Sequence, residues 1–313
     1  MDEGVKEQIQ NESKRHSATV EFMLRFVRDK PLGTFGAIII LLTIVVAIFA
    51  NFLAPYDYKA FELVDSFQSP SIHHLLGTDN LGRDILSRMI IGTRISCVAG
   101  FGGAAIATAV SVLIGASSGF LGGIVDIVVQ RFVDGFMCFP ALIIVMSVMA
   151  ILKPGLLQVV LVLGITGGIS GSRIVRGAVI GIKQNIYIEA SRAIGCTPSQ
   201  ILRRHIMPNI MAPIIVMFSV SVGSMILAEA TLSFLGYGIP PPMPSWGGML
   251  SLEGRRYMLQ APLMAVWPGA ALAFVVYGVN MFGDALRDML DPRLKGGLGS
   301  YRKPKITKQK SKA

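Results

Sequence analysis

The sequence predicts an all-α membrane protein that crosses the bilayer six times. Of its 313 residues, 52% are hydrophobic and only 15% are charged, whereas a soluble domain carries about 25% charged residues. The charges are also grouped, and the runs between them contain no Asp, Glu, Lys or Arg. Each run is long enough for a helix to cross ~30 Å of hydrocarbon. These runs cover residues 33–56, 95–125, 135–152, 154–172, 205–228 and 257–283.

The six predicted spans belong to one transmembrane domain, residues 33–290, between an N-terminal tail (1–32) and a basic C-terminal tail (291–313). The first span follows a polar tail and precedes five others, so we interpret it as a retained helix and not as a cleaved signal. In order, the spans are predicted at residues 34–54, 96–119, 135–152, 156–174, 212–234 and 262–283.

Breaks within the spans are predicted from proline and glycine. Lys153, Pro154 and Gly155 predict a tight turn between the third and fourth spans. Pro140 and Pro268 predict kinks in the third and sixth spans, because proline removes a helical hydrogen bond.

The distribution of basic residues predicts the orientation. Most of the 29 Lys and Arg residues lie in the two tails and in the loop 175–210, which share one side of a six-span topology. The positive-inside rule places that side in the cytoplasm. The net charge of +10 then suits a surface of anionic lipid, and nucleic acid is not an expected partner.

A helix is predicted just before the second span, over residues 81–94. The pairs Asp79/Arg83 and Asp84/Arg88 have helical i, i+4 spacing, and Thr78, Asp79 and Asn80 offer capping oxygens. Two interpretations remain open: an amphipathic helix on the outer interface, or the outer end of a long second helix.

Small residues recur at helical spacing inside two spans. Such stripes let helix backbones approach closely in a membrane. The pattern does not separate packing within the chain from packing against a partner helix. The stripes are Gly115, Gly119 and Gly123 in the second span, and Gly164/Gly168 and Gly167/Gly171 in the fourth.

The loop 175–210 has an elaborate polar sequence. It predicts a helix over 184–194, a break at Gly195, and a second helix capped by Thr197 with Pro198 at its first position. We interpret the loop either as a rigid projection that docks on another protein or as an amphipathic helix lying on the membrane.

Residues for catalysis or metal binding are not recognisable. The chain lacks a P-loop motif, and its His and Cys residues do not have metal-ligand spacing. The three cysteines predict no disulfide, because none falls in an outer loop.

Acidic residues in or beside the spans are candidates for a path or for structure. Glu229 is the only acid in the fifth span, and at that depth it must face the bundle or a water-filled path. It is either a translocation-path residue or a structural partner. Asp126, Arg131 and Asp134 predict an interfacial charge network at the entry to the third span.

The loop motif resembles the "EAA" coupling loop of ATP-binding-cassette (ABC) importer permeases. The segment runs from Glu189-Ala190-Ser191 through Gly195 to Met207-Pro208. It departs from the family at Ser191 and Met207, where Ala and Leu are common. A second segment, residues 76–84, is similar to the C-type permeases of the dipeptide, oligopeptide and nickel branch. Further similar segments are residues 228–236, 244–247 and 284–293.

This resemblance implies a type I importer fold of the MetI-like kind with a cytoplasmic coupling helix. It assigns the loop to ATPase coupling through Glu189, Ala190, Ser191, Gly195, His205, Met207 and Pro208. It assigns an outer-interface signature to Gly77, Thr78, Asp79, Gly82, Arg83 and Asp84.

The resemblance also implies partners. These are cytoplasmic ATPase subunits that bind ATP and Mg, a second homologous permease, and an extracytoplasmic substrate-binding protein, so the chain itself is expected to bind no cofactor. The expected location is the cell membrane of a prokaryote. The expected solutes are di- and oligopeptides, with nickel chelates or another small solute as alternatives.

Two other classes were weighed. An ion-coupled secondary transporter would use Glu229 as its coupling site and would need more than one charge at membrane depth. A membrane-embedded enzyme would need paired acids or histidines at that depth, which the sequence lacks.

Overall fold

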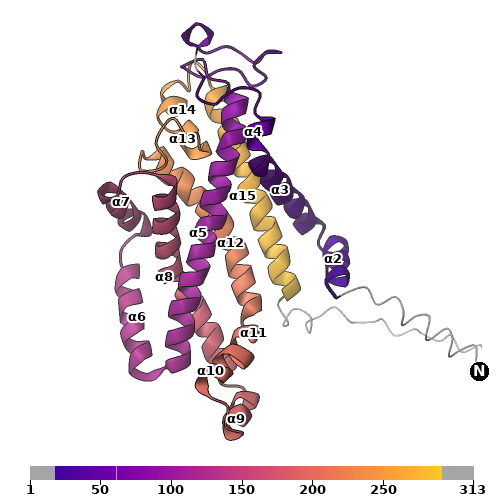
Figure 1. Cartoon of the computed structure of the whole chain (residues 1–313), viewed down its shortest axis with the longest axis vertical. Helices are drawn as coiled ribbons and strands as arrows, with labels where there is room; N and C mark the ends of the chain where they lie inside the picture. Colours follow the sequence, from indigo (N-terminus) through magenta and orange to yellow (C-terminus); the bar gives the residue numbers. More distant parts are fainter. Residues whose placement is uncertain (1–17, 61, 291–313) are drawn as a thin grey trace, which may run out of the picture.

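A computed structural model describes residues 18–60 and 62–290 as an elongated bundle of helices (Figure 1). Five helices within these ranges are long and apolar enough to cross a membrane, and a bent pair makes up to six. The all-α prediction is confirmed for the described residues, where the β-structure is an isolated bridge between Thr78 and Asp84.

The chain enters the bundle through α2 (Ala18–Asp29) and α3 (Pro31–Ile48), followed by α4 (Ala50–Leu53). The predicted tail 1–32 therefore contains a helix, and the first span begins before residue 34. Pro31 occupies the first turn of α3, where its missing N–H costs nothing and its φ suits a helix. Residues 291–313, the predicted basic tail, lie outside the described residues.

The second span is longer than predicted. Helix α5 runs from Ile85 to Leu121, about 55 Å at 1.5 Å per residue. The residues predicted as a separate helix are thus the outer end of this long helix, and residues 81–84 are not helical. The charge-free run underestimated the span because Arg88 and Arg94 at its start are neutralised by groups of the outer segment.

The third predicted span is not one helix. Helices α6 (Gly123–Met137) and α7 (Ala141–Ile151) are bent by 85°. Pro140 stands immediately before α7; its ring blocks the helical carbonyl and it has no N–H to donate. The predicted kink is confirmed there, but it is a break between two helices. Pro268 lies inside a continuous α15.

The remaining long helices are α8 (Leu156–Lys183), α12 (Met211–Phe234) and α15 (Leu263–Leu290). Successive crossings alternate in direction, so the start of α3 and the end of α15 lie toward the same end as the loop after α8 (Figure 1). The opposite end carries η1 (Leu63–Asp65), α13 (Trp246–Leu250) and α14 (Leu252–Arg256).

The glycine stripes pack helices of this chain against each other. A Cβ at Gly115 would lie 2.3 Å from the Ser172 carbonyl oxygen of α8, and one at Gly164 would lie 2.6 Å from Cβ of Ile106 on α5. A third contact joins α3 to α15, where a Cβ at Gly36 would lie 2.3 Å from the Gly278 carbonyl. Gly123 falls outside α5 and has no heavy atom within 4 Å of such a Cβ.

Candidate functional site

The loop after α8 folds as a helix, a glycine corner and a second helical run. Helix α9 spans Ile186–Ala193, and Gly195 follows with φ +86°. A capping box then starts the second run: Gln200 N donates to Thr197 Oγ1 at 3.3 Å, and Thr197 N donates to Gln200 Oε1 at 2.9 Å. The predicted break and cap are both confirmed.

The second run is irregular. It consists of α10 (Pro198–Gln200), a π-helical turn at Ile201–Ile206 and α11 (Met207–Asn209). Sequence reasoning missed the π turn, because its i→i+5 bonding leaves the same apolar residues on the inner face. The loop lies at the extreme end of the bundle (Figure 1).

One face of the loop is locked onto the bundle. Ile188, Ile201 and Ile206 are fully or almost fully buried and form one apolar cluster with Val175 and Val179 of α8. Ala116 of α5 completes that cluster. Displacing the loop as a unit must therefore push on α8 and on the inner end of α5, because close-packed interiors transmit strain.

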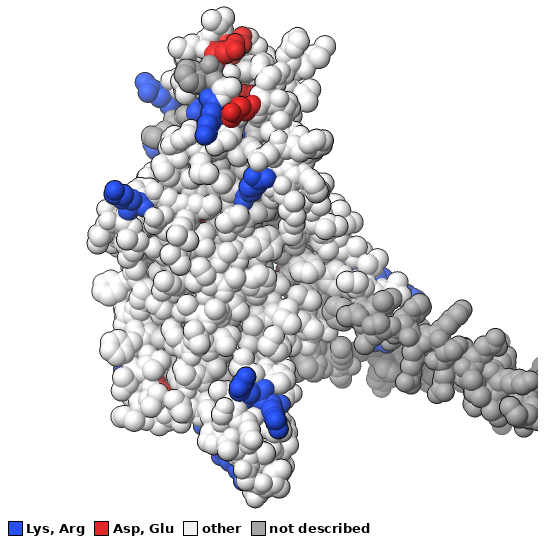
Figure 2. All heavy atoms as spheres, viewed as in Figure 1, with Lys and Arg blue, Asp and Glu red and all other residues white. Residues whose placement is uncertain are grey.

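The other face is free of contacts within the chain. Ile186 and Ile194 expose 83% and 80% of their surfaces, and Glu189, Ala190 and Gly195 are exposed beside them. Exposed basic side chains, Arg203 and Arg204, border this tip (Figure 2). Large apolar side chains grouped at a protruding tip are typical of a protein docking surface.

The other residues assigned to coupling serve the inner side of the loop. Ser191 is buried and its hydroxyl donates to the Tyr187 carbonyl at 2.7 Å. His205 and Met207 are half-buried, and Pro208 is exposed at the start of α11. The motif thus divides into an outward group and a group that holds the loop's shape.

The outer-interface signature builds a compact turn at the opposite end. Gly77 and Gly82 have φ of +82° and +73°. Asp79 Oδ1 accepts from Leu81 N at 2.8 Å and from Arg83 N at 3.0 Å, and its Oδ2 accepts from Arg83 Nε at 2.6 Å. The expected Asp79–Arg83 pair therefore exists, but in a turn and not in a helix.

Asp84 is the cap of α5, and not Thr78, Asp79 or Asn80 as predicted. Its Oδ2 accepts from Ser87 N at 2.8 Å and from Ser87 Oγ at 2.7 Å. His74 Nδ1 lies 3.0 Å from Asp84 Oδ1. Thr78 is buried between the Gln68 N–H, 2.9 Å away, and the Asp65 carbonyl. The signature residues thus shape the outer segment and start α5.

Arg94 fastens the same region to the first span. Its Nε donates to the Ala47 carbonyl at 2.9 Å, and its two terminal nitrogens reach Asn51 Oδ1 and the Ile48 carbonyl at 3.0 Å each. The sequence contained no signal for this contact, since the partners lie more than forty residues away.

Glu229 is enclosed in the bundle, with none of its surface exposed. Ser233 Oγ donates to Glu229 Oε1 at 2.7 Å, and Ser245 Oγ lies 3.4 Å from Ser233 Oγ. These serines join α12 to the start of α13. This position agrees with the structural interpretation of Glu229.

The charge network near α6 is present. Asp126 makes two bonds of 2.6 Å to Arg176 of α8, and Asp134 pairs with Arg173. Arg131 lies 3.7 Å from Asp134. The network ties α6 to α8.

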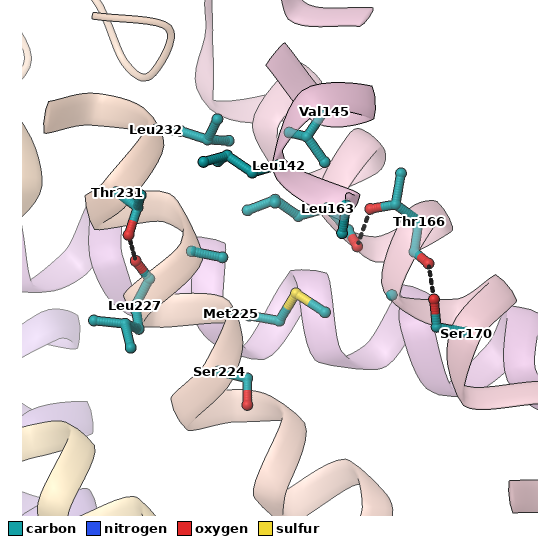
Figure 3. Close-up of a pocket in the computed structure, with 13 residues that line it drawn as sticks. Leu142, Val145, Leu163, Thr166, Ser170, Ser224, Met225, Leu227, Thr231 and Leu232 are labelled. Atoms are coloured by element: carbon teal, nitrogen blue, oxygen red, sulfur yellow. Dashed lines mark hydrogen bonds between the residues drawn. The ribbon is translucent and has the colours of Figure 1, made fainter. Parts of the chain in front are cut away.

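A cavity of about 470 Å³ lies between α7, α8 and α12 (Figure 3). Among the described residues that line it, none is charged. Sequence reasoning missed it, although hydroxyl residues in spans were a usable signal. Its lining is Ala141, Leu142, Val145, Leu163, Thr166, Gly167, Ser170, Ser224, Met225, Leu227, Ala228, Thr231 and Leu232.

A multi-crossing helical bundle with an uncharged internal cavity and a rigid basic projection at one end defines a membrane transport component. Comparison with known proteins specifies the class. Residues 111–296 match the family described as binding-protein-dependent transport system inner membrane component, and residues 17–73 match the N-terminal TM domain of oligopeptide transport permease C. The chain belongs to this family of ABC importer permeases.

Curated relatives cover most of the chain. It is 40% identical over 273 residues to the oligopeptide transport system permease protein OppC of Bacillus subtilis (strain 168), covering 87% of this chain and 89% of that protein. It is 39% identical over 276 residues to the glutathione transport system permease protein GsiD of Pectobacterium atrosepticum, covering 88% and 91%.

A solved structure shares the fold. The MetNI methionine ABC transporter in an inward-facing conformation matches with a TM-score of 0.51 and 22% identity, covering 66% of this chain and 96% of the matched chain. The predicted MetI-like type I importer fold is thereby confirmed. The chain is a multi-pass membrane permease, and its relatives are transport subunits.

Proposed function

We propose that this chain forms half of the membrane path of an ABC importer for di- and oligopeptides and receives the power stroke through the α9–α11 loop. The observation that carries this proposal is the two-faced loop: one face is buried against α8 and α5, and the other exposes Ile194 beside the Gly195 corner. The named solutes of the relatives, oligopeptides and glutathione, are both peptidic and support the solute class.

The proposal assigns each partner a place. Cytoplasmic ATPase subunits bind ATP and Mg and receive the loop tip in a groove. A second homologous permease closes the path. An extracytoplasmic binding protein delivers the solute to the outer segments around residues 54–84 and 235–262. This arrangement puts the loop and both termini in the cytoplasm of a prokaryotic cell, as the basic loop supports.

Coupling follows from the packing. When nucleotide draws the ATPases together, the loop tips move with them, and the buried isoleucines carry that motion into α8. Alternating access results if α8 and α5, which pack at glycine distance, move as one unit. The ion-coupled alternative is less well supported, because Glu229 is bound to Ser233 and does not line the cavity.

The Gly195 corner provides the test. No heavy atom lies within 4 Å of a Cβ built there, so a substitution acts only through the backbone. With φ at +86°, a β-branched residue is strained, whereas Asn tolerates this region. We expect Gly195→Val to weaken co-purification of the ATPase and ATP-driven peptide uptake at least tenfold, with Gly195→Asn close to wild type.

Glu189→Lys, on the exposed face of α9, tests the docking surface without backbone strain. It should weaken ATPase binding while the permease pair stays folded and monodisperse. Unchanged ATPase binding and uptake in both Gly195→Val and Glu189→Lys would reject the loop as the coupling element. Uptake that persists without any ATPase would favour the ion-coupled transporter.

A further inference from the structure

We propose that the cavity between α7, α8 and α12 is a solute-contact site for a ligand that combines an apolar side chain with N–H donors, such as the amino end or an amide of a peptide. The inference rests on the proposed function and specifies which part of the solute this wall accepts. It excludes a carboxylate and a lipid tail as the preferred occupant.

The cavity has an apolar floor and an open rim. Val145, Leu163 and Leu232 are buried at its base, while Leu142 and Leu227 are exposed at its edge (Figure 3). Its volume of about 470 Å³ falls within the ~300–1,000 Å³ of small-molecule sites. The floor therefore suits the side chain of a small peptide.

Four hydroxyl groups border this apolar surface, and each donates its hydrogen to its own helix. Thr166 Oγ1 donates to the Val162 carbonyl at 2.8 Å, and Thr231 Oγ1 donates to the Leu227 carbonyl at 2.8 Å. Ser224 and Ser170 donate in the same way to the carbonyls of Val220, at 3.3 Å, and Thr166, at 3.4 Å. Two of these bonds are drawn in Figure 3.

A hydroxyl has one hydrogen and two lone pairs. Because each hydrogen is engaged by a helix carbonyl, these oxygens present acceptors to the cavity. An ammonium or amide N–H satisfies such acceptors. A carboxylate finds neither a donor nor a positive charge among the described lining residues, and removing it from water without a partner is costly.

The same oxygens argue against a lipid tail. An acyl chain cannot hydrogen-bond, so it would leave the hydroxyl oxygens without a second partner in an apolar site. Met225 gives the wall tolerance for different side chains: its terminal methyl lies 2.5 Å from where a Cβ at Gly167 would be, and methionine adapts readily to irregular shapes.

Charge selectivity at a single cysteine tests the assignment. Cys138 and Cys196, which are exposed and half-buried, are replaced by Ser, and Ser224→Cys is introduced in the assembled importer. Two thiosulfonate reagents of similar size, one aminoethyl and one sulfonatoethyl, are then compared. Ser147→Cys, an exposed α7 position outside the cavity lining, calibrates their intrinsic reactivities.

We expect the aminoethyl reagent to be favoured at Ser224→Cys at least tenfold more than at Ser147→Cys, and trileucine to slow that reaction. Equal ratios at the two positions would overturn the inference. So would reaction with only a lipophilic uncharged reagent, which would identify a lipid-filled groove.

A functional arm uses isosteric removal of the acceptors. The double variant Thr166→Val/Thr231→Val should lower ATP-driven trileucine uptake about tenfold, since two hydrogen-bond acceptors are lost. Thr43→Val is the control, because Thr43 makes the same back-bond at 2.7 Å on α3 away from the cavity. Equal uptake in the two would contradict the site.

The two proposals fail differently. If all variants bind and stimulate the ATPase normally but show no charge preference, the solute site is wrong and the importer function stands. If wild-type uptake does not depend on the ATPase, the importer function itself is wrong.

Discussion

At the scale of single residues, the outer turn shows how tightly one position can be constrained. Gly82 adopts φ +73°, and a Cβ there would lie 1.9 Å from the Glu62 carbonyl oxygen. Both the backbone conformation and the neighbouring main chain therefore demand glycine. The buried polar groups around it, Asp79 and Asp84, are held by the hydrogen bonds that this turn permits.

Gly82→Ala should destabilise the outer segment. The left-handed conformation costs an L residue roughly 1–2 kcal/mol, and the contact with Glu62 adds to this. We expect a lower unfolding temperature of the purified importer and loss of binding-protein-stimulated ATP hydrolysis.

Gly177→Ala is the matched control for this change. Gly177 lies in α8 with nothing within 4 Å of a built Cβ, and alanine favours a helix by about 1 kcal/mol over glycine. A Gly82→Ala protein as stable as the Gly177→Ala protein would show that the turn does not adopt this conformation.

At the scale of helices, α6 is held to the bundle mainly by charge. Much of its surface is apolar and exposed within this chain, including Ile124 and Phe132. Its contact with α8 is the two-bond pair of Asp126 and Arg176, whose side chains are 15% and 33% exposed. Since bidentate guanidinium–carboxylate pairs are the stronger kind, this pair orients α6.

We therefore expect Asp126→Arg and Arg176→Asp each to lower the unfolding temperature of the complex, by about 1–2 kcal/mol of unfolding free energy. The double charge swap should recover part of that loss, measured by thermal denaturation at low and high salt. Arg131→Met serves as control, because Arg131 is 79% exposed and 3.7 Å from Asp134. Strictly additive effects of the two single changes would argue against the pair.

At the scale of the whole molecule, the alternating crossings place the two ends on opposite sides of the membrane. In a background with Cys138 and Cys196 replaced by Ser, Ser69→Cys in the outer segment should react with an impermeant maleimide in intact cells. Ser199→Cys in the loop should react only after permeabilisation. Both positions are exposed, so a reversed result would invert the orientation that the basic residues predict.

Much of the architecture followed from local sequence. Uncharged runs locate the long helices, since a charge at membrane depth is costly. The Gly195 break and the Thr197 cap are confirmed because capping depends on residues within one turn of each other. The family motifs identified the class, and relatives over most of the chain confirm it.

Long-range contacts decided the rest. The length of α5 depends on Arg94 finding Ala47 and on the outer segment that surrounds Arg88, and the partners of the glycine stripes depend on which helices meet. The cavity exists only because α7, bent by 85° from α6, opens a space beside α8 and α12. Sequence by itself determined which segments enter the membrane, because that depends on local hydrophobicity. Tertiary structure decided what they enclose, because an enclosed space is made by residues distant in the chain.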